Sequence, residues 1–169
     1  MNALTQEGAE PMDQPMTAQG FDAAWGAYGS MVYRLAMVYL GRPADAEDVT
    51  QEAFLRLLSK APAFTDAEHE KRWLLRVTVN LCRDQLKGFW RKRAAALELE
   101  EPAPDPAALG VAQAIVALPE QYKAPIHLHY CEGYSVAEIG EILHLGQSAV
   151  KMRLKRGREL LKLELEGET

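Results

Sequence analysis

Residues 134–161 contain two stretches of helical periodicity with a short break between them, and this pair limits the fold more than any other feature. Ser135 is a favourable N-cap, and Glu138 three residues later completes a capping box. The first helix has an apolar face at helical spacing, made of Val136, Ile139, Gly140 and Leu143. After a break at residues 144–146, the second helix is expected to bury Val150, Leu154, Gly157 and Leu161.

The opposite face of the second helix is basic. It carries Ser148, Lys151, Met152, Lys155 and Arg156, with Arg153, Arg158 and Lys162 at its flanks. Charged helix faces are usually only solvated, but here six basic residues stand against one acid in a chain whose net charge is −5. A short amphipathic helix, a turn and a basic helix are typical of a helix-turn-helix motif. The sequence therefore predicts a helix that enters the major groove of DNA.

The rest of the chain predicts an all-α fold. Helix-forming residues dominate, and no alternating run indicates a strand. No apolar run is long enough to cross a membrane, and the N-terminus lacks the pattern of a signal peptide. Cys82 and Cys131 are interpreted as buried or half-buried thiols in a reducing cytoplasm, because neither belongs to a zinc-ligand pattern.

Residues 1–19 are rich in polar residues and are expected to be disordered. A helix is expected from about Gly20 to Leu40, and another opens at Pro43 and Asp45. Val49, Ala53, Phe54, Leu57 and Leu58 would form the core face of this second helix. Its other face carries Asp48, Gln51, Glu52 and Leu55, which indicate either a partner surface or an ordinary solvated face.

A third helix is expected from about Lys71 to Trp90, after a loop that contains Phe64. One side of it carries a stripe of cations and one amide, formed by Arg72, Arg76, Asn80, Arg83 and Lys87. Its inner face would consist of Leu74, Val77, Thr78 and Leu81. Cations with nearby aromatic residues suit unpaired nucleic acid, although Trp73 fits a core position equally well. Phe64 is either a core residue or an exposed aromatic.

An acidic, proline-rich segment, 94–108, divides the chain into two helical domains, 20–93 and 109–169. The second domain is expected to begin with a helix over residues 111–118. A longer helix from Pro119 to about Glu132 follows, with Gly133 as its cap. Pro125 is expected to kink or restart that helix.

Three segments in this order resemble the bacterial RNA polymerase sigma factors of the sigma-70 family, extracytoplasmic-function (ECF) type. DAEDVTQEAFLRLL is similar to the family helix that binds the clamp helices of the polymerase β′ subunit. FTDAEHEKRWLLRVTVNLCRDQL is similar to the segment that opens and reads the −10 element. LPEQYKAPIHLHYCEGYSVAEIGEILHLGQSAVKMRLKRGRELL is similar to the domain that reads the −35 element.

The resemblance implies roles for individual residues. Core polymerase would be bound by Asp48, Gln51, Glu52 and Leu55. The −10 element would be contacted by Phe64, Arg76, Asn80, Arg83 and Lys87. The −35 element would be contacted by Ser148, Lys151, Met152, Arg153, Lys155 and Arg156. The sequence departs from the family in its acidic loop after Phe64, in Pro125 and residues 127–130, and in Gly157 where alanine is frequent.

The sequence thus predicts a promoter-specificity subunit and not an enzyme. Its partners would be the polymerase core, through the β′ clamp helices and the β flap, and promoter DNA. The resemblance also implies an anti-sigma factor that is anchored in the membrane. No cofactor, metal or small-molecule substrate is implied. Two alternatives remain: a helix-turn-helix regulator that acts without polymerase, and an adaptor that only sequesters a partner.

Overall fold

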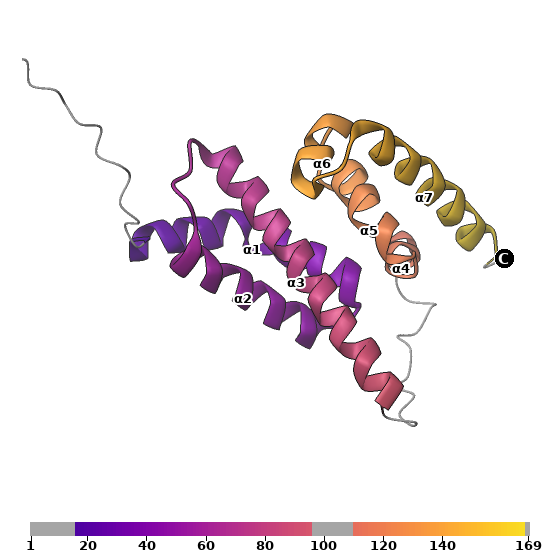
Figure 1. The fold of residues 1–169 in the computed structure, drawn as a ribbon, viewed down its shortest axis with the longest axis horizontal. Helices are drawn as coiled ribbons and strands as arrows, with labels where there is room; N and C mark the ends of the chain where they lie inside the picture. The colour runs from indigo at the N-terminus through magenta and orange to yellow at the C-terminus, as the bar shows by residue number, and fades with distance from the viewer. Residues whose placement is uncertain (1–15, 96–109, 168–169) are drawn as a thin grey trace, which may run out of the picture.

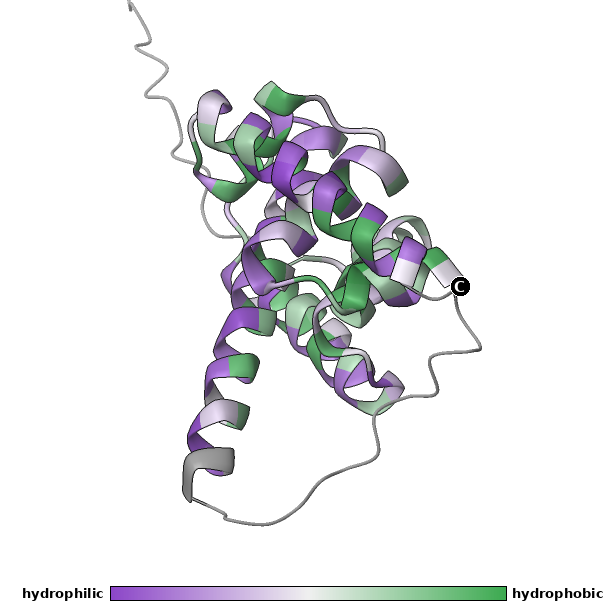
Figure 2. Cartoon of the chain, turned by 90° about the vertical axis from the view of Figure 1, so that its right-hand side faces the viewer, coloured by the Kyte–Doolittle hydropathy of each residue, from purple (hydrophilic) through white to green (hydrophobic). Residues whose placement is uncertain are grey.

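The computed structural model describes residues 16–95 and 110–167, and its described residues form helices and no strands. Three helices form the first half: α1 (Ala18–Leu40), α2 (Pro43–Lys60) and α3 (Ala67–Ala95). The second half consists of α4 (Gly110–Val116), α5 (Glu120–Ile126), the π-helical turn η2 (His127–Cys131), α6 (Val136–Leu143) and α7 (Gln147–Gly167). Figure 1 shows the two groups side by side, and Figure 2 shows that the helices carry both hydrophilic and hydrophobic residues.

The ends of α1 and the start of α2 follow the rules of helix capping. The Thr17 side chain accepts a hydrogen bond from the Gly20 N–H, so α1 begins two residues before the expected Gly20. Gly41 ends α1 in a left-handed conformation, with φ of 68°, and donates its N–H to the Met37 carbonyl. Pro43 occupies the first turn of α2, where a missing N–H costs nothing. Of the expected disordered segment 1–19, residues 1–15 lie outside the described part.

Helix α3 is longer than the sequence suggested, because it begins at Ala67 and not at Lys71. The Asp66 carboxylate accepts a hydrogen bond from the His69 N–H at 2.8 Å, as an N-cap does. The helix continues to Ala95, two residues into the segment expected to be a linker. The remainder of that linker lies outside the described residues. At about 1.5 Å per residue, α3 is about 44 Å long.

The two halves share one hydrophobic cluster. Helix α1 contacts α4 and α5, and α3 contacts α6, so buried residues of both halves are in contact. Gly41 lies where α4 approaches, because a Cβ at this position would be 3.2 Å from the Val116 side chain. Leu58 was expected in the core but is 37% exposed, and Val77 is only half-buried. The buried face of α3 instead consists of Leu74, Leu75, Thr78, Val79, Leu81 and Cys82.

The expected helix over residues 119–132 changes type after Pro125. Pro125 stays inside α5, and the backbone then widens into η2 before Gly133 ends it with φ of 75°.

The two thiols also differ. Cys82 is buried, and burial raises its pKa to about 12, whereas Cys131 is exposed and not half-buried as expected. No helix in the described ranges has the length and apolarity needed to span a membrane.

Candidate nucleic-acid interface

The helix-turn-helix forms as the sequence predicts. The Ser135 side chain accepts a hydrogen bond from the Glu138 N–H, and the Glu138 carboxylate accepts one from the Ser135 N–H, which completes the capping box. These bonds, with Arg72 nearby, lower the pKa of Glu138. Gly140 permits the tight turn between the helices, since a Cβ there would lie 2.6 Å from the Leu145 carbonyl oxygen. His144 ends α6 in a left-handed conformation, with φ of 54°.

The basic face of α7 is open to solvent. Its exposed members are Ser148, Lys151, Met152, Lys155 and Arg156, whereas Arg153 is half-buried. Met152 is 72% exposed, which is unusual for an apolar side chain and suits a contact surface. Val150, Leu154 and Gly157 are buried on the other face, as expected, and Leu161 is half-buried. An alanine at Gly157 would bring its Cβ within 2.7 Å of Ile126, which explains this departure from the family pattern.

The loop before α3 forms a cleft of about 550 Å³ with the first turns of that helix. Phe64 is half-buried and packs edge-on against His69 and Trp73, with ring centroids 5.2 and 5.7 Å apart. The Thr65 N–H donates to His69 Nδ1, which fixes the loop conformation. The cleft is lined by Thr65, Asp66, Glu68, His69, Arg72, Trp73 and Arg76 from this half and by Glu141 and Ile142 of α6.

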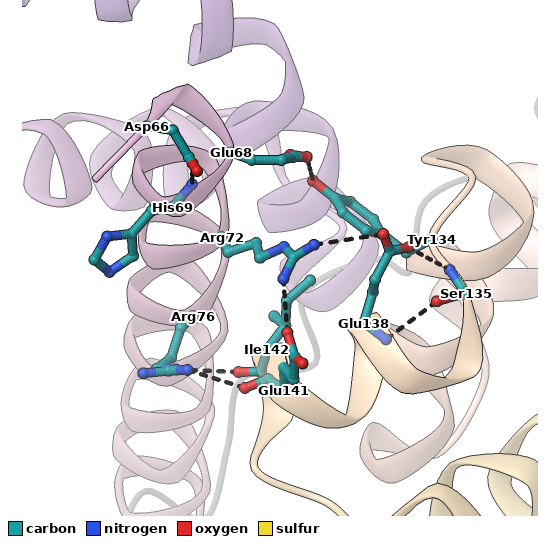
Figure 3. A network of polar contacts seen from close by, with 10 residues as sticks. All are labelled: Asp66, Glu68, His69, Arg72, Arg76, Tyr134, Ser135, Glu138, Glu141 and Ile142. Carbon is teal, nitrogen blue, oxygen red and sulfur yellow. Dashed lines mark hydrogen bonds and ion pairs between the residues drawn. The ribbon is translucent and has the colours of Figure 1, made fainter. Parts of the chain in front are cut away.

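The stripe along α3 is not a row of free cations. Asn80 and Lys87 are exposed, but Arg72, Arg76 and Arg83 are half-buried against the second half. Arg72 forms ion pairs with Glu138 and Glu141, and Arg76 donates to two carbonyl oxygens at the end of α6 (Figure 3). Arg83 Nε lies 3.3 Å from Glu120 Oε1. The residues assigned to the −10 element therefore lie along α3, except Phe64, which lies in the loop before it. Residues of the second half already bind part of this α3 surface.

The acidic face of α2 is exposed along its whole length. Asp48, Gln51, Glu52 and Leu55 all face solvent, and Leu55 is 56% exposed. Glu52 forms an ion pair with Arg56 at 3.3 Å on the same helix. Beside this face, a cleft of about 580 Å³ lies between α1 and α2 and is bordered by Trp25, which is 44% exposed. The exposure fits a partner surface, and nothing in the described structure covers it.

Several contact residues between the halves were not identified from the sequence. Lys123 is buried and donates from Nζ to the carbonyl oxygens of Val38 and Tyr39, both at 3.2 Å. Arg34 pairs with Glu132 at 3.1 Å, and His127 Nε2 lies 3.3 Å from the same carboxylate. Burial lowers the pKa of Lys123 and of His127. The only sequence signal for these contacts was Lys123, a single lysine in the mostly apolar segment 122–128. The described residues hold no cluster of three metal-ligating side chains.

Comparisons with known proteins agree with both halves of this architecture. The family model for sigma-70 region 2 matches residues 25–94, and the one for sigma-70 region 4 matches residues 109–161. The ECF RNA polymerase sigma factor SigE of Mycolicibacterium smegmatis is 33% identical, over 90% of this chain and 69% of that protein. The chain belongs to the sigma-70 family. It is an ECF-type promoter-specificity subunit that acts in transcription initiation.

Further sigma factors agree in sequence or in fold. SigW of Bacillus subtilis, also an ECF sigma factor, is 31% identical over 82% of this chain and 84% of that protein. The sigma factor RpoE, solved in complex with the anti-sigma factor NepR from Bartonella quintana, has a TM-score of 0.73 at 20% identity and covers 88% of this chain and 98% of its own. CnrH, solved with the cytosolic domain of CnrY, has a TM-score of 0.65 at 21% identity and covers 90% of this chain and 92% of its own. At these identities the two structures establish the fold.

Proposed function

We propose that this sigma factor binds core polymerase through α2 and reads its promoter at two separate surfaces. The acidic face of α2 would dock on the β′ clamp helices, with Asp48, Gln51, Glu52 and Leu55 in contact. The basic face of α7 would enter the −35 major groove, where its cations neutralise phosphates. The α3 stripe and the loop at Phe64 would hold the unpaired −10 strand. The single observation that carries this proposal is that the α2 face and the α7 face are both exposed on a chain that matches regions 2 and 4.

The division of labour follows the domain boundaries proposed from the sequence. Residues 20–93 would bind core and the −10 element, residues 109–169 would bind the −35 element and the β flap, and residues 94–108 would connect them. Flipping a base out of the stack costs a few kcal/mol. Stacking on aromatic side chains, at about 1–3 kcal/mol per base, would offset that cost. We assign no catalytic role to this chain, because core polymerase supplies the chemistry. We place the chain in the cytoplasm, together with the polymerase that it would bind.

We also propose as a partner an anti-sigma factor that is anchored in the membrane. RpoE and CnrH, which have the same fold, were each solved with a second protein, NepR and the cytosolic domain of CnrY. A regulator that acts without polymerase is not favoured, because it would not explain the exposed acidic face of α2. The adaptor alternative predicts that substitution of Lys151, Lys155 and Arg156 leaves the function of the protein unchanged, because an adaptor has no promoter activity.

The test is transcription in vitro with purified chain, bacterial core polymerase and fragmented genomic DNA from the source, followed by sequencing of the transcript 5′ ends. We expect new start sites that share a −35 and −10 pair and that are absent with core alone. A matched variant, Lys151→Ala with Lys155→Ala, should lose these starts while it keeps core binding. Tight core binding without new starts would contradict promoter recognition and favour the adaptor.

A further inference from the structure

Met152 is the most exposed of the large apolar side chains in the described part of the chain, at 72%. It lies in the second turn of α7, which begins at Gln147. A single apolar side chain on a surface needs no explanation by itself. This one, however, lies in the middle of the basic face that the proposed function places in the −35 major groove.

The buried face of α7 determines the direction in which Met152 points. Val150 and Leu154 are buried, with exposed fractions of 0% and 3%. A Cβ at Gly140 would lie 3.9 Å from the Val150 side chain, so Val150 packs against α6. Met152 is two residues from both Val150 and Leu154, which places it on the opposite side of a helix with 3.6 residues per turn. It therefore projects away from the second half, on whose outer side α7 lies (Figure 1).

The neighbours of Met152 on this face leave its thioether uncovered. A long side chain in a helix leans toward the N-terminus and covers the preceding turn. The residues four and three positions earlier are Ser148 and Ala149, and both are small. Met152 thus extends beyond its neighbours, in the part of the helix from which a recognition helix reaches base edges.

Two lysines flank Met152. Lys151 and Lys155 are exposed, and neither has a hydrogen bond or an ion pair within the residues that the structure describes. Arg156 differs, because it forms an ion pair with Glu159 at 3.2 Å. The two lysines are therefore available to phosphates on either side of the apolar side chain.

The chemistry of Met152 limits what it can recognise in a major groove. Its sulfur donates no hydrogen bond and is only a weak acceptor, so it cannot read the donor and acceptor pattern of a base pair. The C5 methyl group of thymine is the apolar group that base edges present there. Contact between this methyl group and the thioether would remove apolar surface of both from water.

We infer that Met152 is a specificity-determining residue: it contacts the C5 methyl group of a thymine in the −35 element and selects an A·T pair at that position. This inference deepens the proposed function and rests on the role that it gives to α7. Lys151 and Lys155 would neutralise phosphates beside this contact, so they would add affinity without a preference for thymine.

The first experiment removes the methyl group from the DNA. Holoenzyme, assembled from the full chain and core polymerase, is titrated onto a fluorescein-labelled promoter fragment identified by the transcription assay. Each thymine of its −35 element, on either strand, is replaced in turn by uracil. At one position the parent should bind about fourfold more weakly, as burial of one methyl group predicts. Met152→Ala should bind that fragment and the unmodified fragment equally.

Two outcomes would overturn the inference. The first is a parent whose affinity no uracil replacement lowers. The second is a Met152→Ala variant that keeps the sensitivity of the parent, because another residue would then read the methyl group.

Matched variants separate a base contact from effects on fold or charge. Met152→Leu keeps an apolar side chain and should retain most of the methyl sensitivity. Leu163→Ala shortens another exposed apolar side chain of α7, 64% exposed, and should behave as the parent does. Lys151→Ala should weaken binding to both fragments equally and reduce its dependence on salt concentration. Methyl sensitivity that Leu163→Ala also abolishes would contradict a specific role for Met152.

The second experiment measures the preference among all four bases. A promoter library with randomised −35 positions and a barcode in the transcribed region is transcribed in vitro, and the transcripts are sequenced. The parent should favour an A·T pair at one position, and Met152→Ala should lose this preference while it keeps the others. An equal loss of preference at every position would overturn the inference, because it would indicate a general loss of affinity.

Failure of this inference and failure of the proposed function give different results. Transcripts that depend on the −35 sequence, together with an unchanged thymine preference in Met152→Ala, would reject only the role of Met152. Absence of −35-dependent transcripts from the parent would reject the proposed function itself.

Discussion

The Arg72 guanidinium of α3 binds the Glu141 carboxylate of α6 at 2.6 Å, although the two residues are 69 positions apart in the sequence. Their side chains are 28% and 66% exposed, and ion pairs this exposed contribute about 1 kcal/mol or less. This ion pair therefore contributes little to holding the two halves together. The larger contribution comes from the apolar residues that the halves share, which separation would expose to water.

Reversal of Asp48 and Glu52 to lysine should weaken binding to core polymerase by on the order of tenfold or more, because both carboxylates are exposed on the proposed docking face. The fold should be unaffected, since neither side chain is buried. Titration of labelled sigma factor with core, followed by anisotropy, measures the change.

The matched control for this double variant is Asp22→Lys with Glu164→Lys, which alters two exposed acids outside the α2 face. The control should bind core as the parent does. If both double variants lose the same affinity, net charge and not the α2 face determines the interaction.

Local sequence signals were sufficient for most of the helices. The capping box at Ser135 and Glu138 and the glycine at position 140 each act within a few residues, so the helix-turn-helix could be predicted with its exposed basic face. Where a local signal was overlooked, the boundary was wrong. Asp66 caps α3, and its position directly before Ala67 was visible in the sequence.

The arrangement of the two halves could not be predicted in the same way. The stripe on α3 was expected to suit unpaired nucleic acid, but Arg72, Arg76 and Arg83 bind partners within the chain that are distant in the sequence. The buried Lys123 donates to carbonyl oxygens at the end of α1, and no local sequence pattern predicts such a contact. Leu58 lies at an apolar position of α2 but is 37% exposed. Whether such a position is covered depends on how the neighbouring helices pack against α2, and the sequence pattern does not show this.

Asn80→Ala should reduce opening of the −10 element by about tenfold, because an amide can make paired hydrogen bonds to a base edge. Asn80 is exposed on α3, so its loss leaves the core intact. Permanganate footprinting of the holoenzyme on its promoter measures the opening, and −35 protection should not change. Gln85→Ala removes an amide elsewhere on α3 and serves as the control. A footprint identical to the parent's would contradict the role of Asn80.

Gly140→Ala should destabilise the helix-turn-helix by about 1–3 kcal/mol, because the added Cβ would lie 2.6 Å from the Leu145 carbonyl oxygen. Gly88→Ala is the control. No atom lies within 4 Å of a Cβ at that position in α3, so the variant should gain about 0.5–1 kcal/mol from its better helix propensity. Urea denaturation followed by circular dichroism measures both. A stabilised Gly140→Ala would mean that the turn relaxes without cost.

The buried His127 should make the fold sensitive to mild acid. Burial is the main cause that lowers its pKa; the Glu132 carboxylate acts in the opposite direction, and Arg34 adds to the lowering. Below the ordinary value of 6.5, the unfolded chain therefore binds a proton that the folded chain does not, and stability falls as the pH falls. The free energy of unfolding should decrease from pH 7.5 to 5.5, and His127→Gln should remove much of this decrease. The exposed His144→Asn is the control, and equal pH slopes for all three proteins would show that His127 does not govern the transition.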